Sequence, residues 1–316
     1  MAAAIETDNL TKDFLVGFWR PRPYRALDAL TLAVEQGEVF GFLGPNGAGK
    51  STTLKLLMQL IFPTGGHARI LGKPVGDMSV RKRIGFLAEN PYYYDYLTAE
   101  EVLTYFARLF GFNDVTARVS RVLDEVGIAG ERRLRLRQFS KGMLQRVGLA
   151  QAILNDPDVV FLDEPMSGLD PLGRRQVRDL ILRLRARGCT VFFSSHILSD
   201  AEAMCSRVAI MAQGRLAASG SISDMVAFEP KGWELVVGGV SEELHAELMP
   251  RVKAMRELSP GRFAIELEPR ERPEQLMGEL RSRGARVESF TALRDTLEDF
   301  FLRQVAAIER RDTAGL

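Results

Sequence analysis

A glycine-rich octapeptide has the residue types and spacing to bind phosphate. It reads Gly44-Pro45-Asn46-Gly47-Ala48-Gly49-Lys50-Ser51, which fits the pattern Gly-x-x-x-x-Gly-Lys-[Ser/Thr]. Glycines let the backbone N–H groups curl inward, where a side chain would obstruct the phosphates. A helix that begins near Ser51 adds unpaired amides and its positive dipole end. We therefore expect the loop, together with Thr52 behind it, to cradle the phosphates of ATP.

Within this loop, two side chains have distinct expected roles. Lys50 would place a point charge on the β- and γ-phosphates, and the Ser51 hydroxyl is a hard oxygen ligand suited to Mg²⁺. An acidic pair, Asp163 and Glu164, directly follows the apolar run 159–162. Asp163 is expected to reach Mg²⁺ through water, and Glu164 to polarise the attacking water. Such an acidic pair is common where a strand ends at solvent. Its occurrence together with the phosphate loop is what indicates a catalytic site.

Further motifs give a family resemblance. The segment Phe139-Ser140-Lys141-Gly142-Met143-Leu144-Gln145-Arg146 resembles the signature of ATP-binding cassette (ABC) ATPases, with Lys141 and Met143 replacing the usual Gly and Gln. Ser167-Gly168-Leu169-Asp170 and Ser194-Ser195-His196 then follow in the family's order. Together with the loop and the acidic pair, five motifs cover residues 1–220. Residues 221–316 lie outside the resemblance.

The resemblance implies a site that is shared between two subunits. In the family, two copies pack head to tail, and the signature of one copy closes over the γ-phosphate held by the other. By this analogy, Ser140 and Gly142 act across a dimer interface, and Asp170 helps to organise it. His196 would steady the γ-phosphate and the water near Glu164. The expected catalytic residues are thus Lys50, Glu164 and His196.

One residue departs from the family pattern, and one role in that pattern has more than one candidate. Glu89 occupies the place of the glutamine that senses Mg²⁺ and the membrane partner, and its carboxylate can still bind the metal region. The aromatic residue that stacks on adenine is assigned to Phe14. Trp19 and Tyr24 are alternatives, because the segment that follows Phe14 and contains them is longer than is usual in the family. The tyrosines of segment 91–97 either dock a membrane subunit or pack onto the neighbouring helices.

The elements that must position these residues alternate between strand and helix. Val34, 39–43, 68–71, 84–87, 159–162 and 191–194 have strand character, and 51–62 and 171–188 have helical character. This pattern predicts an α/β fold, a P-loop NTPase (RecA-like) core with a mostly parallel sheet. A helical insert, about 91–155, begins at a capping box, Thr98 to Glu101.

A second pattern follows the small-residue stretch 217–221. Its order of strand, helix, strand, strand, helix and strand over 233–290 predicts a small α+β, ferredoxin-like domain, followed by a helix at 295–308. We therefore expect two domains: an ABC ATPase domain at 1–220, and an accessory domain at 221–316 with a structural or dimer-supporting role.

Composition limits the classes of function. The 316 residues carry a net charge of +1, which does not point to nucleic acid as a partner. The two cysteines, Cys189 and Cys205, lack CxxC spacing and fit buried, unreactive thiols in a reducing compartment. No secretory signal is recognisable at the N-terminus, and no uncharged apolar run approaches the ~18 residues that span a bilayer.

The sequence thus predicts an MgATP-hydrolysing subunit of an ABC exporter. Its expected partners are a second copy of itself and an integral membrane permease, at the cytoplasmic face of the inner membrane. Two alternatives stay open: a non-transport ABC ATPase that acts on a soluble macromolecular partner, and a nucleotide-gated module without turnover. Glu164 and His196 favour hydrolysis over the latter.

Overall fold

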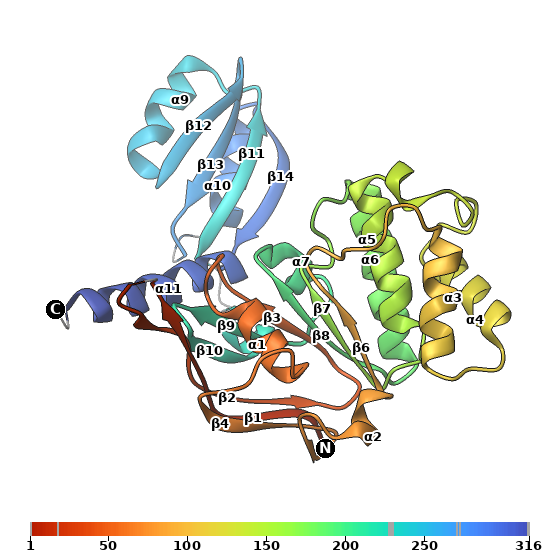
Figure 1. The fold of residues 1–316 in the computed structure, drawn as a ribbon. Helices are drawn as coiled ribbons and strands as arrows, with labels where there is room; N and C mark the ends of the chain where they lie inside the picture. Colours follow the sequence, from red (N-terminus) through yellow and green to blue (C-terminus); the bar gives the residue numbers. More distant parts are fainter. Residues whose placement is uncertain (1, 18, 227–230, 270, 272, 315–316) are drawn as a thin grey trace. The chain divides into compact units, whose positions relative to one another are not determined.

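A six-stranded sheet, whose strands β3, β7 and β8 are fully buried, carries the glycine-rich loop at the end of β3 (Figure 1). The computed structural model describes residues 2–17, 19–226, 231–269, 271 and 273–314. The strand order is β10-β9-β3-β8-β7-β6, with parallel pairing except between β9 and β10. The strands are β3 (Val39–Leu43), β6 (Ile84–Leu87), β7 (Val159–Asp163), β8 (Thr190–Ser195), β9 (Arg207–Ala212) and β10 (Arg215–Ser221). Every residue of β3, β7 and β8 is buried, as in a parallel sheet covered on both faces.

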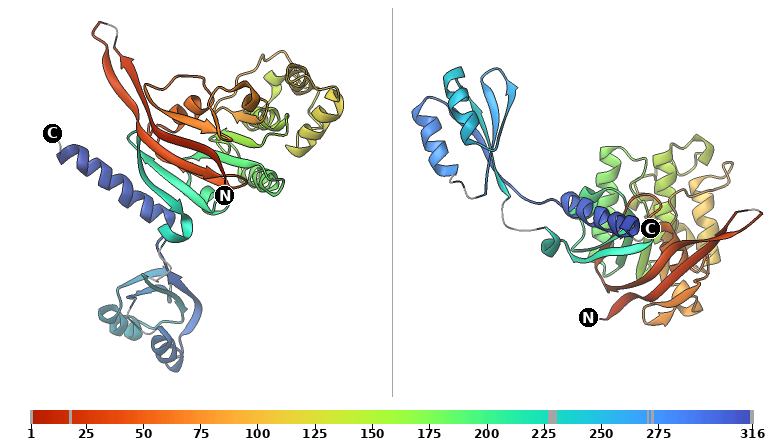
Figure 2. Two further views of the ribbon diagram at one scale, coloured as in Figure 1. Left: turned by 90° about the horizontal axis from the view of Figure 1, so that it is seen from below. Right: turned by 90° about the vertical axis from the view of Figure 1, so that its left-hand side faces the viewer.

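A second, antiparallel sheet has the order β2-β1-β4-β5. Its strands are β1 (Ala3–Val16), β2 (Arg22–Glu35), β4 (Gly65–Ile70) and β5 (Lys73–Pro74). The long β1–β2 ribbon is red in Figure 2. Val34 was expected in a short strand, but it ends this 14-residue strand β2, in a different sheet from β3. The small-residue stretch 217–221 forms part of β10.

Helix α1 (Lys50–Leu57) contacts strands of both sheets, β2 and β4 on one side and β7 on the other. Leu54 and Leu57 of this helix join a core in which Phe192 packs against Phe40, Phe42 and Phe161, with ring centroids 5.1 to 5.8 Å apart. The helix is shorter than the expected 51–62, because Gln59 adopts a left-handed φ of 55° and breaks the helical backbone. The phosphate loop is thus held between two sheets at the start of a buried helix.

The helical insert consists of α3 (Ala99–Leu109), α4 (Val115–Glu125) and α5 (Lys141–Ile153). Its predicted capping box is confirmed: Thr98 Oγ1 accepts from the Glu101 amide at 3.2 Å, and the Thr98 amide donates to Glu101 Oε2 at 2.8 Å. Helix α6 (Pro171–Ala186) begins after its N-cap, Asp170, as predicted. Short helices complete this part: α2 (Met78–Arg81), α7 (Leu198–Glu202) and α8 (Ile222–Met225).

The chain divides into two compact units, one of residues up to Ile222 together with those from Phe301, and one of Ser223–Phe300. The second unit has the predicted βαββαβ order, and its antiparallel sheet runs β12-β13-β11-β14. Leu235, Ile265 and Leu280 lie in its own core. Its elements are β11 (Gly232–Gly238), α9 (Glu242–Leu248), β12 (Ala254–Ser259), β13 (Arg262–Leu267), α10 (Pro273–Ser282) and β14 (Arg286–Leu293), followed by α11 (Leu297–Ala314).

Within the described residues, none of the helices has the length and apolar character needed to cross a bilayer.

The aromatic core predicts a large cost for removing Phe192, which is 0% exposed. Phe192→Ala should lower the free energy of unfolding of the first unit by about 3–5 kcal/mol, because the cavity is enclosed by other rings. Calorimetry of the full chain measures this as a lower melting temperature for one transition. Phe290→Ala is the control: this ring is 42% exposed in the second unit, and its loss should cost less than about 1 kcal/mol. If the melting temperature of the first unit were unchanged in Phe192→Ala, the assignment of Phe192 to its core would be wrong.

The two thiols are predicted to be unreactive in the folded protein. Burial raises the pKa of Cys189 to about 12, with a smaller contribution from the nearby Asp158 carboxylate, and burial also raises the pKa of Cys205. The thiolate is the reactive form, so near pH 8 both should react with Ellman's reagent far more slowly than a free thiol. Unfolding in guanidinium should expose both thiols, and both should then react rapidly. Rapid labelling of either thiol in the folded chain would show that its burial is wrong.

Candidate nucleotide site

A cavity of about 340 Å³ opens over the glycine-rich loop. It is bounded by the loop, the first turn of α1 and the β1–β2 ribbon. Its lining residues are Phe14, Tyr24, Ala26, Pro45, Asn46, Gly47, Gly49, Lys50, Ser51, Thr52, Glu89 and Glu164. The structure therefore brings most of the predicted phosphate-site residues together around one cavity.

The loop's glycines are required by the surrounding backbone as well as by the space for a ligand. A Cβ on Gly44 would lie 2.6 Å from the Met211 carbonyl oxygen. At Gly49, φ is +98° and a Cβ would lie 2.7 Å from the Ala26 carbonyl oxygen. The expectation that side chains here would mainly obstruct phosphate is thus incomplete, because at these two positions the neighbouring strands exclude them.

Lys50 is buried, and its ammonium group is held at the centre of the loop. Its Nζ donates to the carbonyl oxygens of Gly44 at 2.7 Å and Pro45 at 3.2 Å. The same Nζ lies 3.3 Å from Glu164 Oε1, and both side chains are less than a tenth exposed. A buried charge is costly unless it is paired, so the Lys50 ammonium and the Glu164 carboxylate stabilise each other.

Glu164 directly follows β7 and sits in a left-handed conformation, with φ of +49°. Its Oε2 lies 2.8 Å from Nδ1 of His196, a ring that is 49% exposed. Its Oε1 has the ion pair with Lys50 but accepts no hydrogen bond from any residue that the structure describes. This atom can therefore still accept a proton or a hydrogen bond, as a general base requires.

Asp163 lies beside Ser51, and both present oxygen donors. Ser51 Oγ donates to Asp163 Oδ1 at 3.3 Å, and Ser194 Oγ donates to the same oxygen at 2.6 Å. Carboxylate and hydroxyl oxygens are the ligands that Mg²⁺ prefers when phosphate oxygens and water complete its shell. The pair therefore fits the predicted metal position.

Ser194 also accepts a hydrogen bond from the Glu164 amide at 3.0 Å. It thereby fixes both acidic residues, Asp163 and Glu164, at the end of β7. From the sequence, Ser194 was expected only as part of the motif Ser194-Ser195-His196, with no role of its own. The available signal was its place at the end of a parallel strand that neighbours the strand carrying the carboxylates.

At the other end of the cavity, two aromatic residues line the wall. Phe14 and Tyr24 are direct cross-strand partners on β1 and β2, so their side chains share a face of the ribbon. Trp19 is 90% exposed and lies outside the lining. The geometry thus keeps Phe14 as a candidate platform, adds Tyr24 beside it and disfavours Trp19.

The signature residues lie apart from this cavity. Ser140 caps α5, and its Oγ accepts from the Met143 amide at 3.2 Å. Gly142 packs so closely on Leu169 that a Cβ would lie 3.1 Å from its side chain. Asp170 caps α6 through a 2.8 Å bond from the Gly173 amide. None of these three described residues lines the cavity over the phosphate loop.

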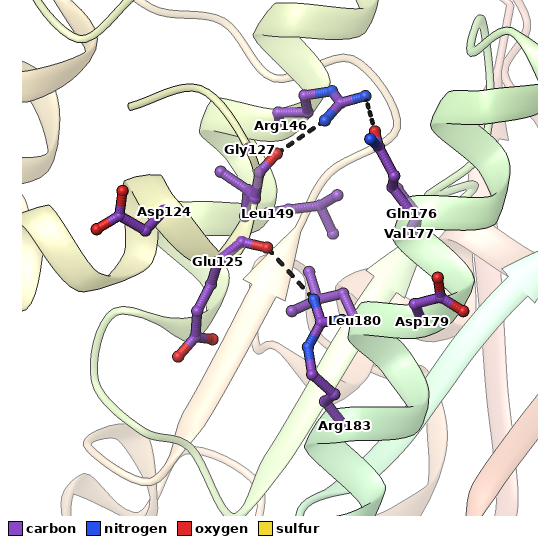
Figure 3. A pocket seen from close by; sticks show the side chains of 11 residues that line it. Asp124, Glu125, Gly127, Arg146, Leu149, Gln176, Val177, Asp179, Leu180 and Arg183 are labelled. Carbon is purple, nitrogen blue, oxygen red and sulfur yellow. Dashed lines mark hydrogen bonds between the residues drawn. The ribbon is translucent and has the colours of Figure 1, made fainter. Parts of the chain in front are cut away.

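A separate cavity of about 200 Å³ lies where the helical insert meets α6 (Figure 3). Arg146 donates to the Val126 carbonyl oxygen at 2.9 Å and to Gln176, while Arg183 donates to the Glu125 carbonyl oxygen at 3.4 Å. These bonds tie the C-terminal end of α4 to α5 and α6. The cavity is lined by none of the predicted site residues.

The tyrosine-rich segment divides between the two expected roles. Tyr93 donates to Gln151 Oε1 of α5 at 2.6 Å, and burial raises its pKa. Tyr92, Tyr94 and Tyr96 are exposed at the surface. Packing onto the helical insert thus accounts for Tyr93, whereas Tyr94 and Tyr96 stack on each other at the surface with ring centroids 5.6 Å apart, and Tyr92 is exposed.

Comparisons with known proteins agree with this site. Residues 27–167 match the family model described as ABC transporter. An ABC transporter ATP-binding protein of Synechocystis sp. is 45% identical over 96% of this chain and 85% of its own length. A fluoroquinolone export ATP-binding protein of Mycobacterium tuberculosis is 40% identical over 63% of this chain and 66% of its own.

A solved structure described as a dimeric bacterial ABC transporter cassette superposes with a TM-score of 0.64. It is 25% identical and covers 69% of this chain and 98% of its own. Its likeness extends the sequence match to the three-dimensional fold of the cassette. From the motifs in place around the cavity and from these matches, the chain belongs to the family of ABC transporter ATP-binding subunits, and it is an ATPase with the P-loop fold.

Proposed function

We propose that this chain hydrolyses MgATP in a head-to-tail dimer and thereby drives an export permease. The observation that carries the proposal is the buried Glu164 carboxylate at the end of the phosphate cavity, 3.3 Å from Lys50 Nζ and 2.8 Å from His196 Nδ1. One acidic group, one fixed cation and one imidazole are the groups that water activation beside a γ-phosphate requires.

Each side chain has a defined part in this proposal. When nucleotide enters, the Lys50 ammonium group pairs with the phosphates in place of Glu164, and the Glu164 carboxylate is released. Glu164 then accepts a proton from the attacking water, while His196 holds the second carboxylate oxygen in place. Ser51 and Asp163 would hold Mg²⁺, which when bound neutralises charge on the β- and γ-phosphates. Glu89 adds a further carboxylate to the same wall.

The proposed dimer explains why Ser140 and Gly142 lie away from the cavity. Both stand at the N-terminal end of α5, where free amides and the helix dipole favour an anion. A second copy would bring this helix end to the γ-phosphate. A similar solved structure, described as a dimeric bacterial ABC transporter cassette, supports the proposal of a dimer.

Export is proposed from the relative whose name states it, a fluoroquinolone export ATP-binding protein. A permease would span the membrane, and this chain would bind it at the cytoplasmic face. The exposed side chains of Tyr92, Tyr94 and Tyr96 are aromatic residues that such a partner could contact. Affinity capture from detergent-solubilised membranes tests this partner. Recovery of a polytopic membrane protein supports export, whereas recovery of soluble assemblies alone would favour a non-transport ATPase.

Glu164→Gln tests the assigned base. Turnover should fall ~10²-fold or more, because the amide cannot accept the proton, while ATP binding is retained at an affinity no weaker than that of the wild type, because Lys50 no longer pairs with a carboxylate. Steady-state phosphate release and nucleotide titration measure the two effects. Glu100→Gln is a matched control, since Glu100 pairs with Arg132 in the helical insert and does not line the cavity. Near-normal turnover of Glu164→Gln would remove the catalytic assignment.

The adenine platform can be tested by truncating its two candidates. Phe14→Ala and Tyr24→Ala should each weaken ATP binding, and the stacking contribution is about 0.5–1.5 kcal/mol per ring. Trp19→Ala should leave the affinity unchanged. The measurement is titration with a fluorescent ATP analogue. If Trp19→Ala alone weakened binding, the base would stack elsewhere than on the Phe14–Tyr24 pair.

A mixed dimer tests whether two copies share a site. Lys50→Ala disables the loop of one copy, and Gly142→Asp places a negative charge in the signature of the other. Each variant alone should be inactive. Mixed together, they restore one intact site if the loop and the signature act across the interface. A mixture that stays inactive, although each variant melts at the wild-type temperature, would contradict the shared site.

A further inference from the structure

The side chain of Gln145 lies directly beneath the assigned base. It stands on the second turn of α5 and is 2% exposed. Its Nε2 donates to the carbonyl oxygen of Glu164 at 3.3 Å and to that of Pro165 at 3.2 Å. A buried side-chain amide thus joins the signature helix to the backbone that carries the catalytic carboxylate.

That backbone needs support from its surroundings. Glu164 has φ of +49°, which is unfavourable for a residue with a Cβ, and it precedes proline, which disfavours such a conformation further. Conformations of this kind persist only where neighbouring groups hold them. Ser194 holds the Glu164 amide, and the Ser167 amide and Gln145 both donate to its carbonyl oxygen. Only Gln145 of these reaches from the helical insert.

Helix α5 is itself anchored next to Gln145. The following residue, Arg146, donates to the Val126 carbonyl oxygen and also to Gln176, and the bond to Gln176 can be followed in Figure 3. At the start of the helix, Gly142 packs against Leu169. A displacement of α5 therefore acts on the Glu164–Pro165 backbone through Gln145, and the Glu164 carboxylate moves with that backbone.

We propose that Gln145 is a positioning residue that sets the place of the Glu164 carboxylate for hydrolysis. The proposal rests on the assignment of Glu164 as general base under the proposed function. Among the described residues, Gln145 is not one of those that line the cavity over the phosphate loop. It acts through the backbone of Glu164, and its loss should slow the chemical step without weakening ATP binding.

The test uses Gln145→Met, which keeps the length of the side chain and removes both donors. Its kcat for basal ATP hydrolysis should fall about 10- to 100-fold, as expected for a displaced catalytic group. KM and the ATP dissociation constant should stay within about threefold. Gln151→Met is the matched control on the same helix, because Gln151 contacts Tyr93 and not Glu164. Its kcat should equal that of the wild type.

Combination with Glu164→Gln separates positioning from general structural damage. If Gln145 acts through the base, Gln145→Met should slow the Glu164→Gln enzyme little further. Additive losses in the double variant, or a kcat within twofold of wild type for Gln145→Met, would overturn the proposal while leaving Glu164 assigned. Normal turnover of Glu164→Gln alone would overturn both assignments, so the two failures are distinguishable.

Gln145→Glu keeps the proposal testable if Gln145→Met does not fold. This carboxyl group can donate to the Glu164 carbonyl oxygen only when it is protonated, and burial favours that form. Its kcat relative to wild type should therefore rise as the pH is lowered from about 8 to about 6. A flat ratio across this range would count against the hydrogen bond as the cause.

Discussion

The pairing of Lys50 with Glu164 is the interaction on which the rest of the site depends. Both groups are buried at the end of the phosphate cavity, with their charged atoms 3.3 Å apart. Neither charge could remain there alone, because removing one partner of a buried pair leaves the other without compensation. A bound polyphosphate offers Lys50 a stronger anion. The pair therefore links occupancy of the cavity to the freedom of the carboxylate that is proposed as the general base.

The fold holds this pair in place from two directions. Strand β3 and helix α1 carry Lys50 in a loop whose glycines fit closely against neighbouring backbone, and β7 ends at the two carboxylates. Ser194 on the adjacent strand and Gln145 on the signature helix then fix the turn after β7. The same signature helix presents Ser140 at its other end. Ser140, which is proposed to contact one phosphate, and Gln145, which is proposed to position the base beside another, thus lie on the same helix.

The elements that could be predicted from the sequence are those that depend on a local pattern of residues. The phosphate loop, the acidic pair after β7, the N-caps at Thr98 and Asp170 and the βαββαβ order of the second unit are all local signals, and the structure confirms those elements. The roles of Gln145 and Ser194 depend on contacts between distant segments. Gln145 meets Glu164 from 19 residues away, and Ser194 from 30. No periodicity in the sequence encodes such pairs. The long strands β1 and β2 were missed because their polar, half-exposed residues obscure the alternation that marks a strand.

The central claim is that phosphate replaces Glu164 as the partner of Lys50. A crystal structure with a non-hydrolysable ATP analogue measures this most directly, through the distance from Lys50 Nζ to Glu164 Oε1. We expect this distance to become longer than the present 3.3 Å, with Nζ on the β- and γ-phosphates and the Glu164–His196 contact retained. An unchanged Lys50–Glu164 pair in the presence of bound nucleotide would contradict it.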